Sequence, residues 1–111
     1  MGADKEERLD RELYVLMQPT RWKIIQTLKN AKTPLYIKEL AKQVGEDRKN
    51  IAFHLLTLAE YGFVDSEYRV IEVPKENPGQ GKAGKYFWLT KKVDAVMSRV
   101  PELMKPATSE T

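Results

Sequence analysis

The fold is decided by residues 37–62, which read IKELAKQVGEDRKNIAFHLLTLAEYG. Apolar side chains in the first third recur at the spacing of one helix face, and Gly45 directly follows them, where glycine accepts the left-handed conformation that ends many helices. Asp47 can then accept a backbone N–H as the cap of a second helix, which Gly62 closes. Two helices joined by so tight a turn predict a helix-turn-helix over residues 36–62.

Two more helices are expected before this motif. Residues 4–17 carry apolar side chains at helical spacing on an otherwise charged segment, and the pattern stops before Pro19. Pro19 suits the first turn of a second helix, because its missing N–H would have no partner there, and a broad apolar face continues to about Asn30. The break at Thr33-Pro34 separates this helix from the helix-turn-helix.

Strand-forming residues follow the helix-turn-helix. Two runs of them flank a segment rich in glycine and proline, which predicts a long β-hairpin over residues 65–90. A last helix over residues 91–104 shows one apolar stripe, and Pro101 should bend or interrupt it. Residues 105–111 are predicted to be a frayed tail.

Three stretches carry a family resemblance over about Leu13 to Val96. Residues 18–28 read QPTRWKIIQTL and residues 84–90 read GKYFWLT. The helix-turn-helix contributes a spaced set of positions between them: Leu40, Ala41, Gly45, Ile51, His54, Leu55, Leu58, Glu60, Tyr61, Gly62, Phe63 and Val64. Together these stretches resemble the ArsR-like family of bacterial and archaeal repressors. Residues 18–28 resemble the family's proline-threonine-arginine helix start, residues 84–90 resemble its second wing strand, and the spaced positions resemble its helix-turn-helix.

The resemblance implies a mainly α fold with a β-hairpin wing, a winged helix-turn-helix with additional N- and C-terminal helices, in one domain over residues 1–104. It also implies a homodimer that binds double-stranded DNA and regulates transcription, with repression the commoner role in the family. Family members pair through their terminal helices, here residues 4–17 and 91–104, which carry more apolar residues than a small domain can bury alone. The expected dimer contacts are Leu9, Leu13, Leu16, Val93, Val96, Met97, Val100 and Met104.

The second helix of the helix-turn-helix has a face opposite its core residues, and this face would enter the major groove, which is about 12 Å wide. The expected DNA contacts on it are Arg48, Lys49, Asn50, Ala52, Phe53 and Leu56. The first three suit phosphates or base edges at a helix start, where the dipole favours anions. The other three are apolar, and three interpretations stay open: contact with thymine methyl groups or sugars in the groove, partial burial of Phe53 in a rotated helix, or contact with another protein.

The hairpin tip combines Lys75, Lys82 and Lys85 with glycines, which makes a flexible basic loop that can follow a phosphate backbone. These glycines do not form a phosphate-cradling loop, because no GK[ST] follows and no helix starts there. His54 has no carboxylate or second histidine at helical spacing. We therefore expect it to pack or hydrogen-bond rather than to act as a base or a metal ligand.

The composition limits the kinds of site that the chain can build. Its 111 residues have room for one domain, and they include no cysteine, a single histidine and a net charge of +3. Disulfides, thiolate metal sites and cysteine nucleophiles are excluded. Metal-sensing members of the ArsR-like family use a cysteine pair, or histidines and carboxylates. Here residues 35–40 read LYIKEL and the last helix offers only Asp94 and Glu102, so we expect no metal and no other cofactor.

The sequence also argues against membrane, secreted and enzymatic functions. No segment has the length and apolar character of a membrane span, and the charged start differs from a signal peptide, so we expect a soluble, cytoplasmic protein without a membrane partner. No nucleophile, base and orienting group recur at meaningful spacing, so we expect no enzyme. The rival to a DNA-binding regulator is a winged helix that contacts proteins of the transcription machinery. No effector can be named from the sequence.

Overall fold

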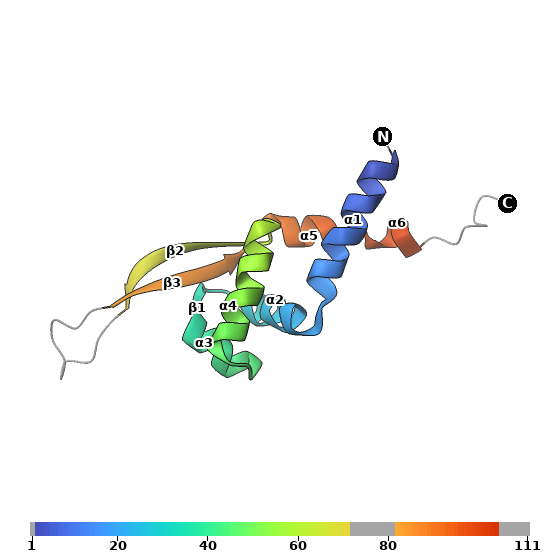
Figure 1. The fold of residues 1–111 in the computed structure, drawn as a ribbon. Coiled ribbons are helices and arrows are strands. Elements are labelled where there is room, and N and C mark those ends of the chain that lie inside the picture. The colour runs from blue at the N-terminus through green and yellow to red at the C-terminus, as the bar shows by residue number, and fades with distance from the viewer. Residues whose placement is uncertain (1, 72–81, 105–111) are drawn as a thin grey trace.

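The computed structural model describes residues 2–71 and 82–104. The chain runs through α1 (Gly2–Met17), α2 (Pro19–Ala31), β1 (Leu35–Tyr36), α3 (Ile37–Val44), α4 (Arg48–Glu60), β2 (Val64–Ile71), β3 (Lys82–Leu89), α5 (Lys91–Met97) and α6 (Val100–Met104). Figure 1 shows a cluster of helices from which the β2–β3 hairpin extends to one side. This is the expected arrangement, mainly α with a β-hairpin wing.

The helix-turn-helix is formed by α3 and α4, and its caps are those that the sequence predicts. Gly45 has a φ of 84°, in the left-handed region, and its N–H donates to the Ala41 carbonyl at 2.9 Å. The Asp47 carboxylate accepts the backbone N–H of Asn50 at 2.7 Å, which caps the start of α4. Gly62 closes α4 with a φ of 79°. The turn is therefore fixed by local chemistry at each end.

The sheet has three strands in the order β1-β3-β2, and both pairings are antiparallel. β2 pairs with β3 from Val64 opposite Leu89 to Ile71 opposite Lys82. β1 pairs Leu35 with Phe87, and the sequence analysis did not predict this strand. A two-residue strand is stabilised by its partner rather than by its own pattern, so it leaves little signal in the sequence.

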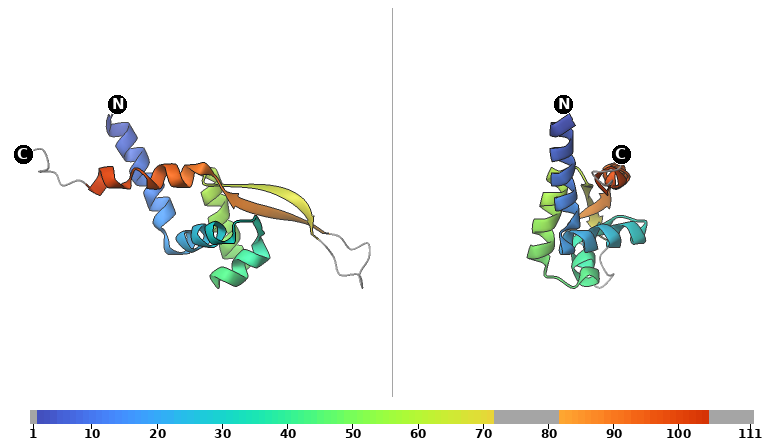
Figure 2. Two further views of the ribbon diagram at one scale, coloured as in Figure 1. Left: turned by 180° about the vertical axis from the view of Figure 1, so that it is seen from behind. Right: turned by 90° about the vertical axis from the view of Figure 1, so that its right-hand side faces the viewer.

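The hydrophobic core lies where α1, α2, α4 and α5 meet the base of the sheet. Its buried members come from α1 to α5 and from all three strands: Leu9, Val15, Leu16, Ile24, Ile25, Leu28, Leu35, Leu40, Ile51, Leu55, Leu58, Phe63, Val64, Phe87, Val93 and Val96. Seen from behind, the start of α1 and α6 lie on the side of the molecule opposite the hairpin (Figure 2, left). The terminal helices and the wing therefore occupy opposite ends.

The last predicted helix is interrupted, as expected from Pro101. α5 ends at Met97 and α6 begins at Val100, because the nitrogen of Pro101 carries no hydrogen to donate to the carbonyl four residues earlier. α6 contributes no buried residue to the core. Within residues 2–71 and 82–104, no helix is both long enough and apolar enough to cross a membrane.

Candidate nucleic-acid interface

The outward face of α4 carries an apolar stripe behind a basic first turn. Arg48 and Lys49 are exposed at the start of the helix, and Ala52 is exposed one turn later. Phe53 and Leu56 are each 60% exposed. The orientation expected from the helical wheel is therefore correct, and the interpretation that Phe53 is partly buried in the core is wrong.

The three polar residues at the start of α4 differ in what they already contact. Arg48 and Lys49 form no ion pair and no side-chain hydrogen bond within the part of the chain that the structure describes. The Asn50 side chain donates from Nδ2 to the Glu46 carboxylate at 3.2 Å and is only partly exposed. The two cations can therefore meet an anion directly, whereas Asn50 must first release Glu46.

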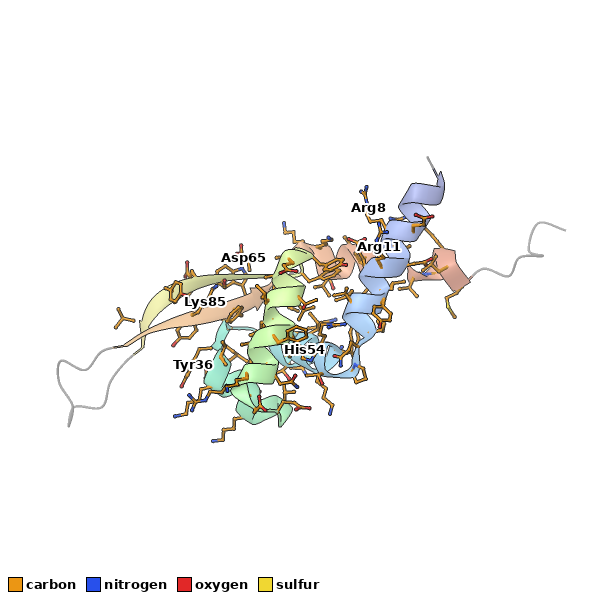
Figure 3. The ribbon with its side chains drawn as sticks, viewed as in Figure 1. Arg8, Arg11, Tyr36, His54, Asp65 and Lys85 are labelled. Atoms are coloured by element: carbon orange, nitrogen blue, oxygen red, sulfur yellow. The ribbon has the colours of Figure 1, made fainter. Side chains whose placement is uncertain are left out.

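The inward face of α4 carries His54, which is buried against α2 (Figure 3). The Arg21 guanidinium donates from Nη1 to His54 Nδ1 at 3.3 Å and from Nε to the Val15 carbonyl at 2.6 Å. Burial lowers the pKa of His54 below its ordinary value of 6.5, the nearby Arg21 charge lowers it further, and the Glu46 carboxylate opposes both effects. His54 is thus a neutral hydrogen-bonding residue of the core, as expected.

Arg21 is a structural residue that the sequence analysis missed. It was read only as part of the family resemblance, yet it is 8% exposed and its guanidinium joins α2 to the end of α1 and to α4. The signal was present in the sequence, because Arg21 stands three, four and seven residues before Ile24, Ile25 and Leu28, on the apolar face of its helix.

A second polar contact joins the terminal helices to the base of the wing. Lys92 Nζ on α5 forms a 2.7 Å ion pair with the Glu12 carboxylate on α1, and it also donates to the Tyr61 carbonyl at the end of α4. The ammonium lies 5.0 Å from the centre of the Phe63 ring. Glu12 is 8% exposed, so the Lys92 ammonium offsets the cost of burying this carboxylate.

The described part of the wing places cations over aromatic rings. Lys85 is exposed on the hairpin (Figure 3), with its ammonium 5.5 Å from the centre of the Tyr68 ring. Arg69, which the sequence analysis did not select, pairs with Glu67 and lies 5.5 Å and 6.0 Å from the ring centres of Tyr86 and Trp88. Lys75 lies outside the described residues, and Lys82 is described only as the first residue of β3.

The expected dimer contacts divide into two groups. Leu9, Leu16, Val93 and Val96 are at most 5% exposed, because α1 packs against α2, α4 and α5 of the same chain. These four side chains are buried in the core of the single chain. The expectation that they contact a partner chain is therefore wrong. Leu13, Met97 and Val100 are partly exposed and Met104 is exposed. The terminal helices also expose large apolar residues that were not selected: Tyr14, Met17 and Leu103.

Among the residues that the structure describes, no group of three or more histidine, cysteine, aspartate or glutamate side chains is placed to hold a metal ion. Asp94 and Glu102 lie on α5 and α6 respectively, and Glu102 instead pairs with Arg99 at 3.3 Å. The side chains exposed on α4 and on the described hairpin are cationic, aromatic and aliphatic, together with the carboxylates of Glu60, Asp65 and Glu67, a set that suits noncovalent contact with a large partner.

Comparisons with known proteins agree with this fold. The model of the family described as HVO_A0114 matches residues 16–78. No curated protein matches the chain. The homodimeric winged helix-turn-helix DNA-binding domain of a possible ArsR-family regulator from Mycobacterium bovis superposes with a TM-score of 0.61 at 16% identity, covering 93% of this chain and 83% of that one.

Two further solved structures are similar. The transcriptional repressor BigR from Xylella fastidiosa gives a TM-score of 0.58 at 23% identity, covering 96% of this chain and 100% of that one. The transcriptional repressor CouR, bound to a 23-mer DNA duplex, gives a TM-score of 0.55 at 18% identity, covering 92% of this chain and 68% of that one. At these identities the likeness establishes the shared winged helix-turn-helix fold, which confirms the resemblance to ArsR-like regulators at the level of the fold.

Proposed function

The chain belongs to the HVO_A0114 family, and we propose that it binds double-stranded DNA as a homodimer and regulates transcription. The observation that carries this proposal is the start of α4, where Arg48 and Lys49 are exposed without a carboxylate partner among the described residues. This is the second helix of a helix-turn-helix, the element that enters the major groove in proteins of this architecture.

The α4 helix has the dimensions that the groove requires. Its 13 residues span about 20 Å, and a groove about 12 Å wide admits one helix. Asp47 already accepts the Asn50 N–H, but the N–H groups of Arg48 and Lys49 in the first turn favour a phosphate oxygen, and the two cations add to this attraction. Arg48 and Lys49 contact phosphates or base edges in the proposed complex, and Asn50 does so once its amide leaves Glu46.

The wing supplies the second contact with the DNA backbone. The hairpin extends away from the terminal helices (Figure 1), so it can lie along the duplex while α4 occupies the groove. Lys85 and Arg69 are exposed on its described part, and we propose that they and the wing lysines Lys75 and Lys82 lie near phosphates. Such contacts increase affinity without selecting a sequence.

The dimer of the proposal uses the exposed apolar residues of the terminal helices. Tyr14 on α1 is 78% exposed and Met104 on α6 is 74% exposed. Large apolar side chains left in water on the terminal helices favour contact with a second copy. A twofold dimer then presents two α4 helices to half-sites one DNA turn, about 34–36 Å, apart. Because BigR and CouR are transcriptional repressors, we propose that this protein is cytoplasmic and represses transcription by occupying a promoter.

One observation favours a second candidate function. Phe53 and Leu56 expose apolar surface on the very helix that should face a polar groove. A winged helix that contacts another protein would bury this surface, so a protein-interaction module remains the competing class. Neither function requires catalysis.

A mobility-shift assay across salt concentrations, with duplexes selected from a random pool, tests the proposal. We expect binding that weakens steeply between about 50 and 200 mM salt, because cations on the protein displace counterions from phosphates. Lys49→Ala should weaken binding, whereas Arg8→Ala, an exposed cation on α1 away from the wing (Figure 3), should leave it unchanged. Absence of any binding at low salt would refute DNA binding and favour the protein-interaction module.

A further inference from the structure

We propose that α4 selects A·T base pairs by burying thymine C5-methyl groups against Phe53 and Leu56. This inference rests on the proposed function and specifies what the recognition helix reads. It assigns sequence preference to the two exposed apolar residues in the middle of the helix. The cations at its start then contribute mainly affinity and register.

The middle of α4 offers the groove no free polar side chain. Ala52, Phe53 and Leu56 point outward between Lys49 and Glu60, and none of these three can donate or accept a hydrogen bond. The hydroxyl of Thr57, beside them on the helix, donates to the Phe53 carbonyl at 3.3 Å within the helix itself. Over more than a turn, therefore, the fully exposed side chains of α4 can contact a base only through apolar atoms.

The major groove presents one apolar group on its base edges, the C5-methyl of thymine. Every other feature there is a hydrogen-bond donor or acceptor, or a ring hydrogen. A·T and G·C pairs both present polar edges that lose water when they are covered, so the thymine methyl group is what distinguishes them: covering it buries apolar surface that a G·C pair does not offer. The apolar stripe therefore favours A·T pairs and disfavours G·C pairs at the positions that it covers.

The spacing of the two side chains suits neighbouring base pairs. Phe53 and Leu56 stand three residues apart, which is about 4.5 Å along the helix axis. Successive base pairs are about 3.4 Å apart. The two side chains therefore cover two adjacent steps of the groove, and the site in each half of a palindrome should contain one or two thymines there.

The Phe53 ring has one aromatic contact within the chain. It makes an edge contact with the His54 ring, with ring centres 5.3 Å apart and planes at 65°. His54 is in turn buried and fixed by the Arg21 guanidinium. This contact favours one orientation of the exposed Phe53 ring, which lowers the conformational entropy lost when the ring meets a methyl group.

Charge favours DNA over a protein as the occupant of this face. The apolar stripe directly follows Arg48 and Lys49, neither of which is paired with a carboxylate within the described residues. Lys38 and Lys42 are also exposed on the adjacent α3. Although Glu60 follows the stripe, the unpaired cations at its start suit a surface that combines methyl groups with phosphates, and a duplex rich in A·T pairs is such a surface.

The experiment replaces single thymines by deoxyuridine in a duplex selected from a random pool. This change removes the C5-methyl and keeps every hydrogen-bonding group of the base pair. We expect the parent protein to lose about fourfold in affinity at one or two thymines of each half-site, the factor that corresponds to about 0.8 kcal/mol for burying one such carbon. Replacement at the remaining thymines should have no effect.

Variants then assign the contact to its side chain. Phe53→Ala and Leu56→Ala should each bind thymine and uracil duplexes equally at one of the sensitive positions. Lys49→Ala, the matched variant one turn earlier on the same face, should bind both duplexes more weakly and keep the difference between them. A thermal unfolding curve shows whether each variant is folded, and if Phe53→Ala is not, Leu56→Ala carries the assignment.

The possible failures are distinguishable. A parent protein that selects no DNA overturns the proposed function, and the methyl contact with it. A parent that selects a defined site but binds thymine and uracil duplexes equally at every position overturns this inference alone. A thymine preference that persists in both alanine variants overturns the assignment to Phe53 and Leu56.

Discussion

Arg21 is an arginine inside the core, and its guanidinium makes polar contacts with two other helices. Replacing it with methionine keeps most of the side-chain volume but leaves the Val15 carbonyl and His54 Nδ1 without their donor. We expect Arg21→Met to lower the free energy of unfolding by about 1.5–3 kcal/mol, as for loss of hydrogen bonds from a charged group. Urea unfolding measures the effect, with Lys23→Met on the exposed face of α2 as the control. Equal stability would mean that the burial of the arginine charge offsets its hydrogen bonds.

His54 gives the stability of the protein a pH dependence of defined sign. Its pKa in the folded chain lies below the ordinary 6.5, chiefly because of burial, so the unfolded chain binds the proton more readily. The stability contributed by neutral His54 is complete above about pH 6.5 and is lost as the pH falls from there toward the folded-state pKa.

The corresponding variant is His54→Gln, which keeps a polar side chain but cannot be protonated in this range. We expect the free energy of unfolding of the parent to fall more steeply than that of His54→Gln between pH 7.5 and pH 5.5, whereas carboxylates common to both affect the two curves alike. Urea unfolding at a series of pH values measures the difference. Parallel curves would contradict the neutral, buried state of His54.

At the scale of helices and strands, the sequence predicts those elements whose signals are local. Gly45 and Asp47 mark the ends of α3 and α4 by their own backbone and side-chain chemistry, and both predictions are correct. β1 was not predictable, because Leu35 and Tyr36 become a strand only by pairing with residues far along the chain. Periodicity also shows that a helix face is apolar without showing what covers it.

That last limit explains the errors at the candidate interface. Leu9 and Val93 were expected at a dimer contact, yet they pack within one chain, since a stripe that meets α5 and one that meets a second copy look alike in sequence. The outward residues Phe53 and Leu56 were predictable, because the opposite face of the same helix carries the core pattern. Arg69 was missed because its position depends on aromatic partners across the hairpin.

The contact between α1 and α5 is an ion pair between Lys92 and Glu12. Removing Lys92 alone should lower the free energy of unfolding, because it leaves the buried carboxylate unpaired. Lys92→Met leaves the buried Glu12 carboxylate without its partner, and we expect a loss of about 1–3 kcal/mol, below the range for fully buried pairs because Lys92 is partly exposed. The double variant Glu12→Gln, Lys92→Met removes the uncompensated charge and should recover part of that loss. Unfolding of the two single variants and the double variant measures the coupling. If the losses simply add, the two groups do not interact in solution.

At the scale of the whole molecule, the two proposed interfaces lie at opposite ends. The hairpin extends from one end, and α6 and the start of α1 lie at the other (Figures 1 and 2). Between them, the Arg21 contact joins α1 to α4 and the Lys92 contact joins α1, α4 and α5. Pairing at the terminal helices would therefore set the position of α4 through two direct polar contacts.

The proposed pairing of the terminal helices predicts that a charge on the exposed face of α1 separates the dimer. Tyr14 on α1 and Val70 on the wing are both 78% exposed, so neither substitution should disturb the core. We expect Tyr14→Glu to sediment as the 12.8 kDa monomer at micromolar concentrations, because a carboxylate in an apolar contact loses water without a partner. Val70→Glu should stay dimeric.

DNA binding gives a second measurement of the same contact. The monomeric Tyr14→Glu should bind a single half-site as the parent does. It should lose the added affinity of a palindrome, since only a dimer engages both halves at once. A parent protein that itself sediments at 12.8 kDa would refute the homodimer, and a dimeric Tyr14→Glu would move the contact away from α1.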